Sequence, residues 1–414
     1  MTRVLLVGAG AREHTIAWKL RQSRKVDEIF VAPGNGGTAS VATNLPIQPK
    51  DIEGLVGAAK DNHVDFYLAS MDDPQPLGLV DRLTAEGILC YGPTAAAARI
   101  ESSKAWAKEF MGRHGIATAA HRAFTDHREA VAYVESLPDD EIWVKASGLA
   151  AGKGAIGCVN QAEARNALDL MMVTREFGSA GDEVVIEQSL KGWETSAHAF
   201  CDGKTAVLMP FSSDHKRALD GDIGANTGGM GAYSPSERVT PELEARIRRE
   251  AVEPTMAGMA AEGVPFNGTL YPGLMVTETG PQVLEFNARM GDPETQVLLP
   301  RLESDLLEVC TAAAEGRLAD IEISWSPRPT VGVVMASGGY PATYKMGYVI
   351  EGLGDIDSDV FVFQAGTKQD DRGLVTYGGR VLTVVAAGDT LAEAREHAYD
   401  NVRRISFEGA HYRT

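Results

Sequence analysis

Two side chains that could hold a metal ion occupy alternate positions in the segment VLEFNARMGDPETQ. On a strand, Glu285 and Asn287 point to the same face because successive side chains alternate. A carboxylate and an amide oxygen on one face, with room left for nucleotide phosphates, are typical of a Mg²⁺ site. Arg289 would share this face and could bind a carboxylate or a phosphate through its planar guanidinium. The alternative is that these residues only form an exposed polar strand face.

The segment VKASGLAAGKGAIG has the glycines and the lysine of a phosphate-binding loop, but not their Walker spacing. A Walker loop has four residues between its first glycine and Gly-Lys, and Ser or Thr follows the lysine. Here three residues separate Gly148 from Gly152, and Gly154 follows Lys153. We instead expect a flexible hairpin whose amides and Lys153 contact phosphates, with Lys145 reaching the same nucleotide. A glycine-rich hairpin without a ligand is the alternative.

The segment GAGAREH places a glycine turn directly before a predicted helix near the N-terminus. The dinucleotide-binding fingerprint has a third glycine where Glu13 stands, and an acid after the second strand where this chain reads PGN, ending at Asn35. A nicotinamide cofactor is therefore disfavoured. The turn with Gly8 and Gly10 still leads into a helix N-terminus, whose amides and dipole favour an anion such as a phosphate. Alternatively, the turn serves packing alone.

The segment SSDHKRALDGDIGANTGGMGAYSP combines charges with glycines and has no apolar periodicity, which predicts a long loop. Loops of this length are usually functional or mobile. Its charged residues are candidates for substrate contact, namely Asp214, His215, Lys216 and Arg217. As isolated charges they would more often be solvated surface.

Short apolar runs and helical patterns alternate along the chain and predict an α/β protein with three blocks. In the first block, runs such as RVLLVGAG and EIFVAPGN alternate with helices, which indicates a doubly wound parallel sheet. Ligands bind at the carboxyl ends of strands in such sheets, where GAGAREH and PGNGGT fall. Pro327 and Pro329 interrupt the pattern later in the chain. We predict domains at 1–101, 102–325 and 326–414.

Composition excludes several classes of function. The formal net charge is −18, and an acidic surface repels phosphate polymers, so we expect no nucleic-acid partner. The four cysteines lie far apart without a CxxC pair, which predicts reduced thiols. The apolar N-terminal run is too short for a membrane span and lacks the layout of a signal peptide. We therefore expect a cytoplasmic protein without a membrane partner.

Taken together, the ordered motifs resemble the ATP-grasp ligases, and among them the members that join glycine to phosphoribosylamine. The motifs that carry the resemblance run from end to end: GAREH, PGNGGT, SKAWAKEF, GLAAGKG, DHKR, NTGGMGAYSP, EFNARMGDPETQ, SGGYP, AGTK and GGRVL. The resemblance implies an N-terminal amine-substrate domain, an ATP-grasp core with a small lid at about 120–190, and a small mixed α/β C-terminal domain.

The resemblance also implies roles for individual residues. Lys104 and Lys145 would contact the ATP phosphates, Glu187 to Leu190 would form the adenine hinge, and Glu194 would hold the ribose hydroxyls. The implied ATP-binding residues are Lys104, Lys145, Gly152, Gly154, Glu187, Gln188, Leu190 and Glu194. The implied metal ligands for Mg²⁺ or Mn²⁺ are Glu285 and Asn287. The implied substrate-binding residues are Gly8, Gly10, Glu13, Asn35, Asp72, Lys216 and Asp292, and the implied catalytic residues are Arg289, Lys153 and Asp214.

The implied reaction uses ATP, glycine and phosphoribosylamine in two steps. The glycine carboxylate attacks the γ-phosphate of ATP to give glycyl phosphate and ADP, and the amine then displaces phosphate to form the amide. Positioning and charge neutralisation suffice for such phosphoryl transfer, so no covalent enzyme nucleophile is needed. A closing lid would protect the acyl phosphate from water. We expect a monomer or a weak homodimer.

Several positions depart from the family pattern, mainly where the amine substrate and the nucleotide loop are expected. The departures are Ala11 in GAREH, Asp72 in SMDDPQP, Ser147 in KASGLAAGKG, Gln364 in QAGTK and Tyr377 in TYGGR. They fit ordinary drift, but also a paralogue that passes glycine to another amine. A third hypothesis is a non-catalytic ATP-binding regulatory protein. The intact Glu285 and Asn287 argue against it, because a protein that only binds ATP does not need a metal pair.

Overall fold

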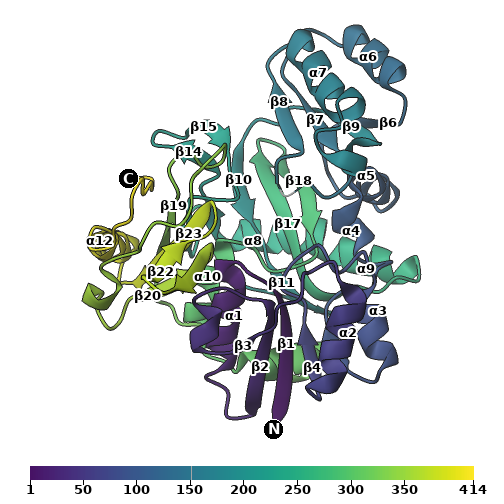
Figure 1. Cartoon of the computed structure of the whole chain (residues 1–414). Coiled ribbons are helices and arrows are strands. Elements are labelled where there is room, and N and C mark those ends of the chain that lie inside the picture. Colours follow the sequence, from purple (N-terminus) through teal and green to yellow (C-terminus); the bar gives the residue numbers. More distant parts are fainter. Residues whose placement is uncertain (151) are drawn as a thin grey trace.

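The computed structural model describes residues 1–150 and 152–414 and has four main sheets (Figure 1). The N-terminal sheet, purple in Figure 1, has the order β3-β2-β1-β4-β5, and all its pairings are parallel. Its strands are β1 (Thr2–Gly8), β2 (Val26–Pro33), β3 (Thr43–Asn44), β4 (Phe66–Leu68) and β5 (Leu89–Tyr91). The helices of this region are α1 (Ala11–Leu20), α2 (Ile52–Asp61), α3 (Leu79–Ala85) and α4 (Arg99–Ser102).

Alternation along β1 explains why this sheet is covered on both faces. Val4 and Leu6 pack with Ile16 of α1, whereas Leu5 packs in a second cluster with Leu55 of α2. Each face of a parallel strand is therefore buried, which is typical of a doubly wound sheet. The prediction of a doubly wound parallel sheet is confirmed.

The lid is a separate antiparallel sheet at the upper right of Figure 1. Its order is β6-β9-β7-β8, with β6 (His121–Phe124), β7 (Ile142–Ala146), β8 (Ala155–Cys158) and β9 (Val184–Gln188). Helices α6 (His127–Ser136) and α7 (Gln161–Leu168) pack on this sheet through a cluster that includes Val134, Leu168 and Ile186. The side chains of Asp126 and Asn160 cap the two helices by accepting backbone N–H groups.

The core sheet carries the segment with the predicted metal ligands. Its strands are β10 (Trp193–Ser196), β11 (Ala199–Asp202), β12 (Ala206–Leu208), β17 (Asn267–Thr277) and β18 (Gly280–Asn287). β17 and β18 form an antiparallel hairpin, which Phe286 anchors to Phe110 of α5 and Met259 of α9 in one apolar cluster. The surrounding helices are α5 (Lys104–Arg113), α8 (Pro241–Ile247), α9 (Glu253–Ala261), α10 (Glu294–Leu298) and α11 (Leu306–Ala314).

The C-terminal sheet, on the left in Figure 1, has the order β13-β16-β19-β23-β20. It combines β19 (Thr330–Ala336), β20 (Phe361–Gln364) and β23 (Arg380–Ala387) with β13 (Ser213–Asp214) and β16 (Gly231–Ser234). The sheet therefore takes two strands from the middle of the chain, which the division of the sequence into blocks did not anticipate. Two hairpins, β14 (Arg217–Leu219) with β15 (Ile223–Asn226) and β21 (Thr367–Asp370) with β22 (Gly373–Thr376), and helix α12 (Leu391–Val402) complete the described fold. No helix within the described ranges has the length and apolarity needed to cross a membrane.

Candidate active site

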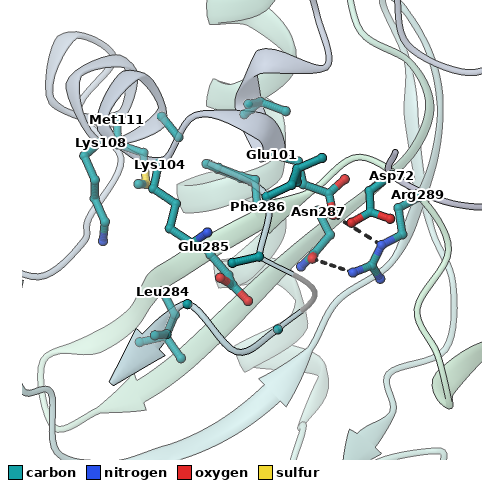
Figure 2. A pocket seen from close by; sticks show the side chains of 17 residues that line it. Asp72, Glu101, Lys104, Lys108, Met111, Leu284, Glu285, Phe286, Asn287 and Arg289 are labelled. Atoms are coloured by element: carbon teal, nitrogen blue, oxygen red, sulfur yellow. Dashed lines mark hydrogen bonds and ion pairs between the residues drawn. The ribbon is translucent and has the colours of Figure 1, made fainter. Parts of the chain in front are cut away.

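A cavity lies where the N-terminal region, α5, the glycine-rich loop and the carboxyl end of β18 meet (Figure 2). Its polar lining comes from Asp72, Glu101, Lys104, Lys108, Glu285, Asn287 and Arg289. Gly152 and Gly154 line the cavity as well. The structure thus brings together predicted residues that are far apart in sequence, and it adds two, Glu101 and Lys108, that the sequence reasoning missed.

The predicted metal ligands Glu285 and Asn287 both line this cavity from the last residues of β18. Burial acts to raise the pKa of Glu285, but Lys104 and Lys145 outweigh it, so the carboxylate stays ionised. The Asn287 amide donates to the carbonyl oxygen of Tyr271 at 3.3 Å, and its oxygen accepts from Arg289 at 2.9 Å.

These donors fit a divalent cation. An ionised carboxylate and an amide oxygen on one strand face are hard oxygen ligands, and a metal there would take its other ligands from phosphates and water. No group of three or more His, Cys, Asp and Glu residues that could hold a metal is present among the described residues.

Arg289 follows β18 and is held from several sides. Its Nε lies 3.2 Å from a Glu101 carboxylate oxygen, and the other Glu101 oxygen accepts from the Ala288 amide at 2.8 Å. Burial raises the pKa of Glu101 to about 7, against the effect of Arg289. Glu101 lies on α4, so this ion pair joins α4 to the segment that follows β18. No sequence motif marked Glu101, because only the fold brings it to Arg289.

Two lysines share one buried carboxylate beside the cavity. Lys145 on β7 and Lys108 on α5 lie 2.9 and 3.0 Å from Glu187 Oε2, and all three side chains are buried. Burial acts to raise the pKa of Glu187, but the lysines outweigh it and the net direction is downward. Burial lowers the pKa of Lys108 to about 8, against the effect of Glu187. Lys108 lies one helical turn after Lys104, a spacing that could have identified it from the sequence.

The glycine-rich loop contributes to the cavity only in part. Gly152 has φ +74°, and a Cβ on Gly154 would lie 2.6 Å from the Ala150 side chain, so both positions suit glycine. Lys104 donates a backbone hydrogen bond to the Ser147 carbonyl at 2.8 Å, which ties α5 to this loop. Lys153 is exposed and is not among the residues that line the cavity. The motif GLAAGKG includes position 151, which lies outside the described residues.

Two of the remaining predicted nucleotide residues line a second groove between β9 and the β17–β18 hairpin, and Glu194 is not among its lining residues. Gln188 and Leu190 line this groove together with Trp193 and Gln282. Glu194 on β10 is exposed and forms an ion pair with Lys216 at 3.1 Å. Gln188 ends β9 and Leu190 comes two residues later, so these two continue the chain from Glu187 beside the main cavity.

Asp214 and Asp292 lie in another polar cluster. The buried Oδ1 of Asp214 accepts no hydrogen bond from the described residues, and burial together with Glu294 raises its pKa well above the usual range. Asp292 forms an ion pair with Arg380 at 3.0 Å. A Cβ on Gly10 would lie 3.1 Å from Asp292 Oδ2, so the cluster adjoins the N-terminal glycine turn.

The N-terminal glycine turn uses its polar side chains internally. Glu13 accepts from the Gly10 amide and from Arg12 Nε, both at 2.7 Å. Asn35 donates to the carbonyl oxygens of Ala9, Gly10 and Gln364, and it accepts from two amides of its own turn. Gly8 has φ +136°, and a Cβ there would collide with Glu13. These side chains shape the turn.

A lid sheet over a core sheet, with lysines and a Glu-Asn pair between them, defines an ATP-grasp ligase. Models of three phosphoribosylglycinamide synthetase domains match the chain: the N domain over 2–101, the ATP-grasp (A) domain over 102–295 and the C domain over 330–414. The chain therefore belongs to the phosphoribosylglycinamide synthetase family. As an ATP-grasp ligase it binds ATP together with a divalent metal ion.

Similar proteins agree along the whole chain. A phosphoribosylamine–glycine ligase from Allochromatium vinosum is 50% identical over 412 residues, which cover 99% of this chain and 96% of that protein. One from Vibrio vulnificus is 47% identical over 414 residues, covering 99% and 96%. The crystal structure of phosphoribosylamine–glycine ligase from Thermotoga maritima has a TM-score of 0.88 and 32% identity, covering 100% and 99%. A biotin carboxylase from Campylobacter jejuni, with a TM-score of 0.76 and 13% identity over 99% and 93%, shares the fold alone.

Proposed function

We propose that this chain ligates glycine to 5-phosphoribosylamine and forms glycinamide ribonucleotide, ADP and phosphate, a step of de novo purine biosynthesis. The observation that carries this proposal is the family match over all three regions, combined with an ionised Glu285 beside Asn287 in the cavity. Mg²⁺ is the metal we propose, with Mn²⁺ as the alternative, because both oxygens are hard ligands.

In the first step a carboxylate oxygen of glycine attacks the γ-phosphorus of ATP, and the bond to the β-γ bridging oxygen breaks to release ADP. When bound, the metal neutralises the phosphate charge. Glu285 and Asn287 would hold the metal. Lys104 on α5 and Lys145 on β7 would bind the phosphate oxygens. Glu187 accepts from Lys145 at 2.9 Å, so it fixes the position of the ammonium group beside the cavity.

In the second step the amine of phosphoribosylamine attacks the acyl carbon of glycyl phosphate. The carbon–oxygen bond to phosphate breaks, and the nitrogen loses a proton as the amide forms. Arg289 is a fixed cation just after β18, because it forms an ion pair with Glu101 and donates to the carbonyl of Met290. We propose that it stabilises the negative charge that passes to the leaving phosphate. The lid would exclude water from the acyl phosphate.

The other residue assignments are part of the same proposal. We keep Glu187, Gln188 and Leu190 for adenine, because they run from the main cavity into the adjoining groove. Ribose binding by Glu194 would require it to release Lys216. The substrate assignments of Gly8, Gly10, Glu13, Asn35, Asp72, Lys216 and Asp292 and the catalytic ones of Lys153 and Asp214 stay as predicted. The domain boundaries at 101 and 325, the lid at about 120–190 and a monomer or weak homodimer are likewise predictions.

A cytoplasmic location is part of the same proposal. All four cysteines are free thiols, which suits a reducing compartment. Glycine, phosphoribosylamine and ATP would be available to the enzyme in the cytoplasm.

The test is the substrate dependence of ADP release. We expect release only when Mg²⁺, glycine and phosphoribosylamine generated in situ are all present. We also expect the gene to restore growth of a purine-requiring strain that lacks this step. ADP release that ignores phosphoribosylamine would contradict the proposal.

A second candidate is a ligase that passes glycine to a different amine. It is favoured by Asp72, a departure from the family pattern that lines the cavity and acts electrostatically on Arg289. ADP release with glycine and another amine, together with failure of the growth rescue, would select this candidate.

A further inference from the structure

Arg380 reaches from the C-terminal sheet to two turns of the ATP-grasp region. It begins β23 within the motif GGRVL, and its side chain is 20% exposed. Its guanidinium lies 3.0 Å from the Asp292 carboxylate and donates to the Asp292 carbonyl oxygen at 3.0 Å. The same guanidinium donates to the carbonyl oxygen of Gly228. One side chain therefore connects two segments that are more than sixty residues apart in sequence.

Tyr340 and Arg380, both in the C-terminal region, form hydrogen bonds with the backbone N–H and the carbonyl of Gly228. Its amide donates to the Tyr340 hydroxyl at 3.0 Å, and its carbonyl accepts from Arg380. A Cβ on Gly228 would lie 3.0 Å from the Arg380 Cζ, so only glycine lets the guanidinium come this close without a shift. The turn is therefore clamped from one side.

The next residue carries this constraint to Asp214. Gly229 has φ +108°, and a Cβ there would lie 2.6 Å from Asp214 Oδ1 and would also collide with Pro293. The Gly229 backbone thus packs directly on the Asp214 carboxylate, whose Oδ1 accepts no hydrogen bond from any residue that the structure describes. A displacement of the Gly228–Gly229 turn would move the backbone that packs against this carboxylate.

We propose that Arg380, assisted by Tyr340, is a positioning residue that fixes the Gly228–Gly229 turn and Asp292 around Asp214 and thereby sets the affinity for the amino-acid substrate. This inference rests on the proposed function and on the predicted role of Asp214 in substrate contact, with glycine taken as the substrate that it contacts. The substrate it concerns is a small zwitterion, whose ammonium group a buried carboxylate without a hydrogen-bond donor would recognise. Arginine is needed because its planar fork can bind a carboxylate and backbone carbonyls at once, which a lysine ammonium cannot reproduce.

The test compares the steady-state kinetics of Arg380→Met and Arg380→Lys with those of the unchanged enzyme, varying each substrate in turn. We expect Arg380→Met to raise KM for glycine about tenfold or more, as for the loss of charge-assisted hydrogen bonds, with KM for ATP within about twofold. Arg380→Lys should recover only part of the loss. Gly228→Ala keeps the arginine, but its methyl group should displace the Gly228–Gly229 turn from the guanidinium. This variant should raise KM for glycine in the same way. The double variant should be less than additive, because both changes disrupt one contact.

Arg404→Met is the matched control. Arg404 follows the end of α12 in the C-terminal region and, like Arg380, forms an ion pair, in this case with Asp357. It should leave all KM values unchanged even if the melting temperature falls. Equal kinetics for Arg380→Met and Arg404→Met, or a uniform fall in kcat with unchanged KM for glycine, would overturn the positioning role. If the unchanged enzyme released no ADP in response to glycine, the proposed function itself would fail, and this outcome is distinct from the first.

Discussion

The carboxyl end of β18 and the N-terminal glycine turn both carry polar side chains at the edge of a sheet, yet they use them differently. At β18, Glu285 faces the cavity near Lys104, and the Asn287 oxygen meets Arg289 (Figure 2). At the N-terminal turn, Glu13 and Asn35 spend their hydrogen-bonding capacity on the backbone of the protein itself. At β18 the Glu285 carboxylate faces a ligand, and the Asn287 oxygen keeps a second lone pair beside its bond from Arg289, whereas the side chains of the turn build the shape into which a ligand would fit.

This difference has a physical origin. A β-strand projects alternate side chains to one face, so two polar residues on β18 reach the cavity without help from the backbone. A tight glycine turn leaves several amides and carbonyls without partners in regular structure, and nearby side chains must satisfy them. The comparison predicts that changes at β18 abolish activity and spare stability, whereas changes at the turn lower stability.

The largest expected effect is that of Glu285→Gln. This change keeps the size of the side chain but removes the negative charge among Lys104, Lys145 and Lys216, so the proposed metal site would lose the anionic one of its two proposed protein ligands. We expect ADP release to fall about a thousandfold, as for the removal of a principal electrostatic group. The free energy of unfolding should change by less than about 1 kcal/mol. Urea denaturation and Mn²⁺ binding measured by electron paramagnetic resonance report the two quantities separately.

The control is Glu408→Gln, in the exposed turn that follows α12, which should preserve both activity and Mn²⁺ binding. An active Glu285→Gln enzyme with undiminished Mn²⁺ affinity would remove the metal assignment.

A smaller effect on a different quantity is expected for Asn35→Ala. The change deletes five hydrogen bonds of a side chain that is 7% exposed and leaves the buried amides of Gly37 and Thr38 without their acceptor. The free energy of unfolding should fall by about 3 kcal/mol. Asn62→Ala, which removes a single hydrogen bond at the end of α2, should cost less than about 1 kcal/mol. Equal costs for the two variants in urea denaturation would contradict the structural role of Asn35.

The sequence was sufficient for the parts of this site that depend on periodicity and local motifs. The Glu285–Asn287 pair follows from strand alternation, and the parallel N-terminal sheet follows from the alternation of apolar runs and helices. Three residues depend on tertiary structure: Glu101, Lys108 and Arg380 acquire their partners Arg289, Glu187 and Asp292 only after segments distant in sequence meet. The joining of β13 and β16 to the C-terminal sheet was not predictable either, since antiparallel partners leave no mark in local composition.

The smallest of the three effects is a pH dependence of stability at the N-terminal turn. His14 on α1 accepts a hydrogen bond from the Gln364 amide at 2.9 Å, and burial lowers its pKa from 6.5 to about 4. Between these values the unfolded chain binds a proton that the folded protein does not, so stability decreases as the pH falls from 6.5 towards 4. The contribution of His14 between pH 7.5 and pH 5 is about 2 kcal/mol.

Urea denaturation at the two pH values tests this contribution. His14→Phe should be less stable than the unchanged protein at pH 7.5, because the Gln364 amide loses its acceptor, but it should lose about 2 kcal/mol less on acidification. Part of the dependence should remain, because burial also lowers the pKa of His198 to about 4. Asn62→Ala, which removes no titratable group, serves as the control and should leave the pH dependence unchanged. Parallel losses in His14→Phe and the unchanged protein would mean that the imidazole gains a proton within the folded turn, and the turn would then not be the closed hydrogen-bonded unit that distinguishes it from β18.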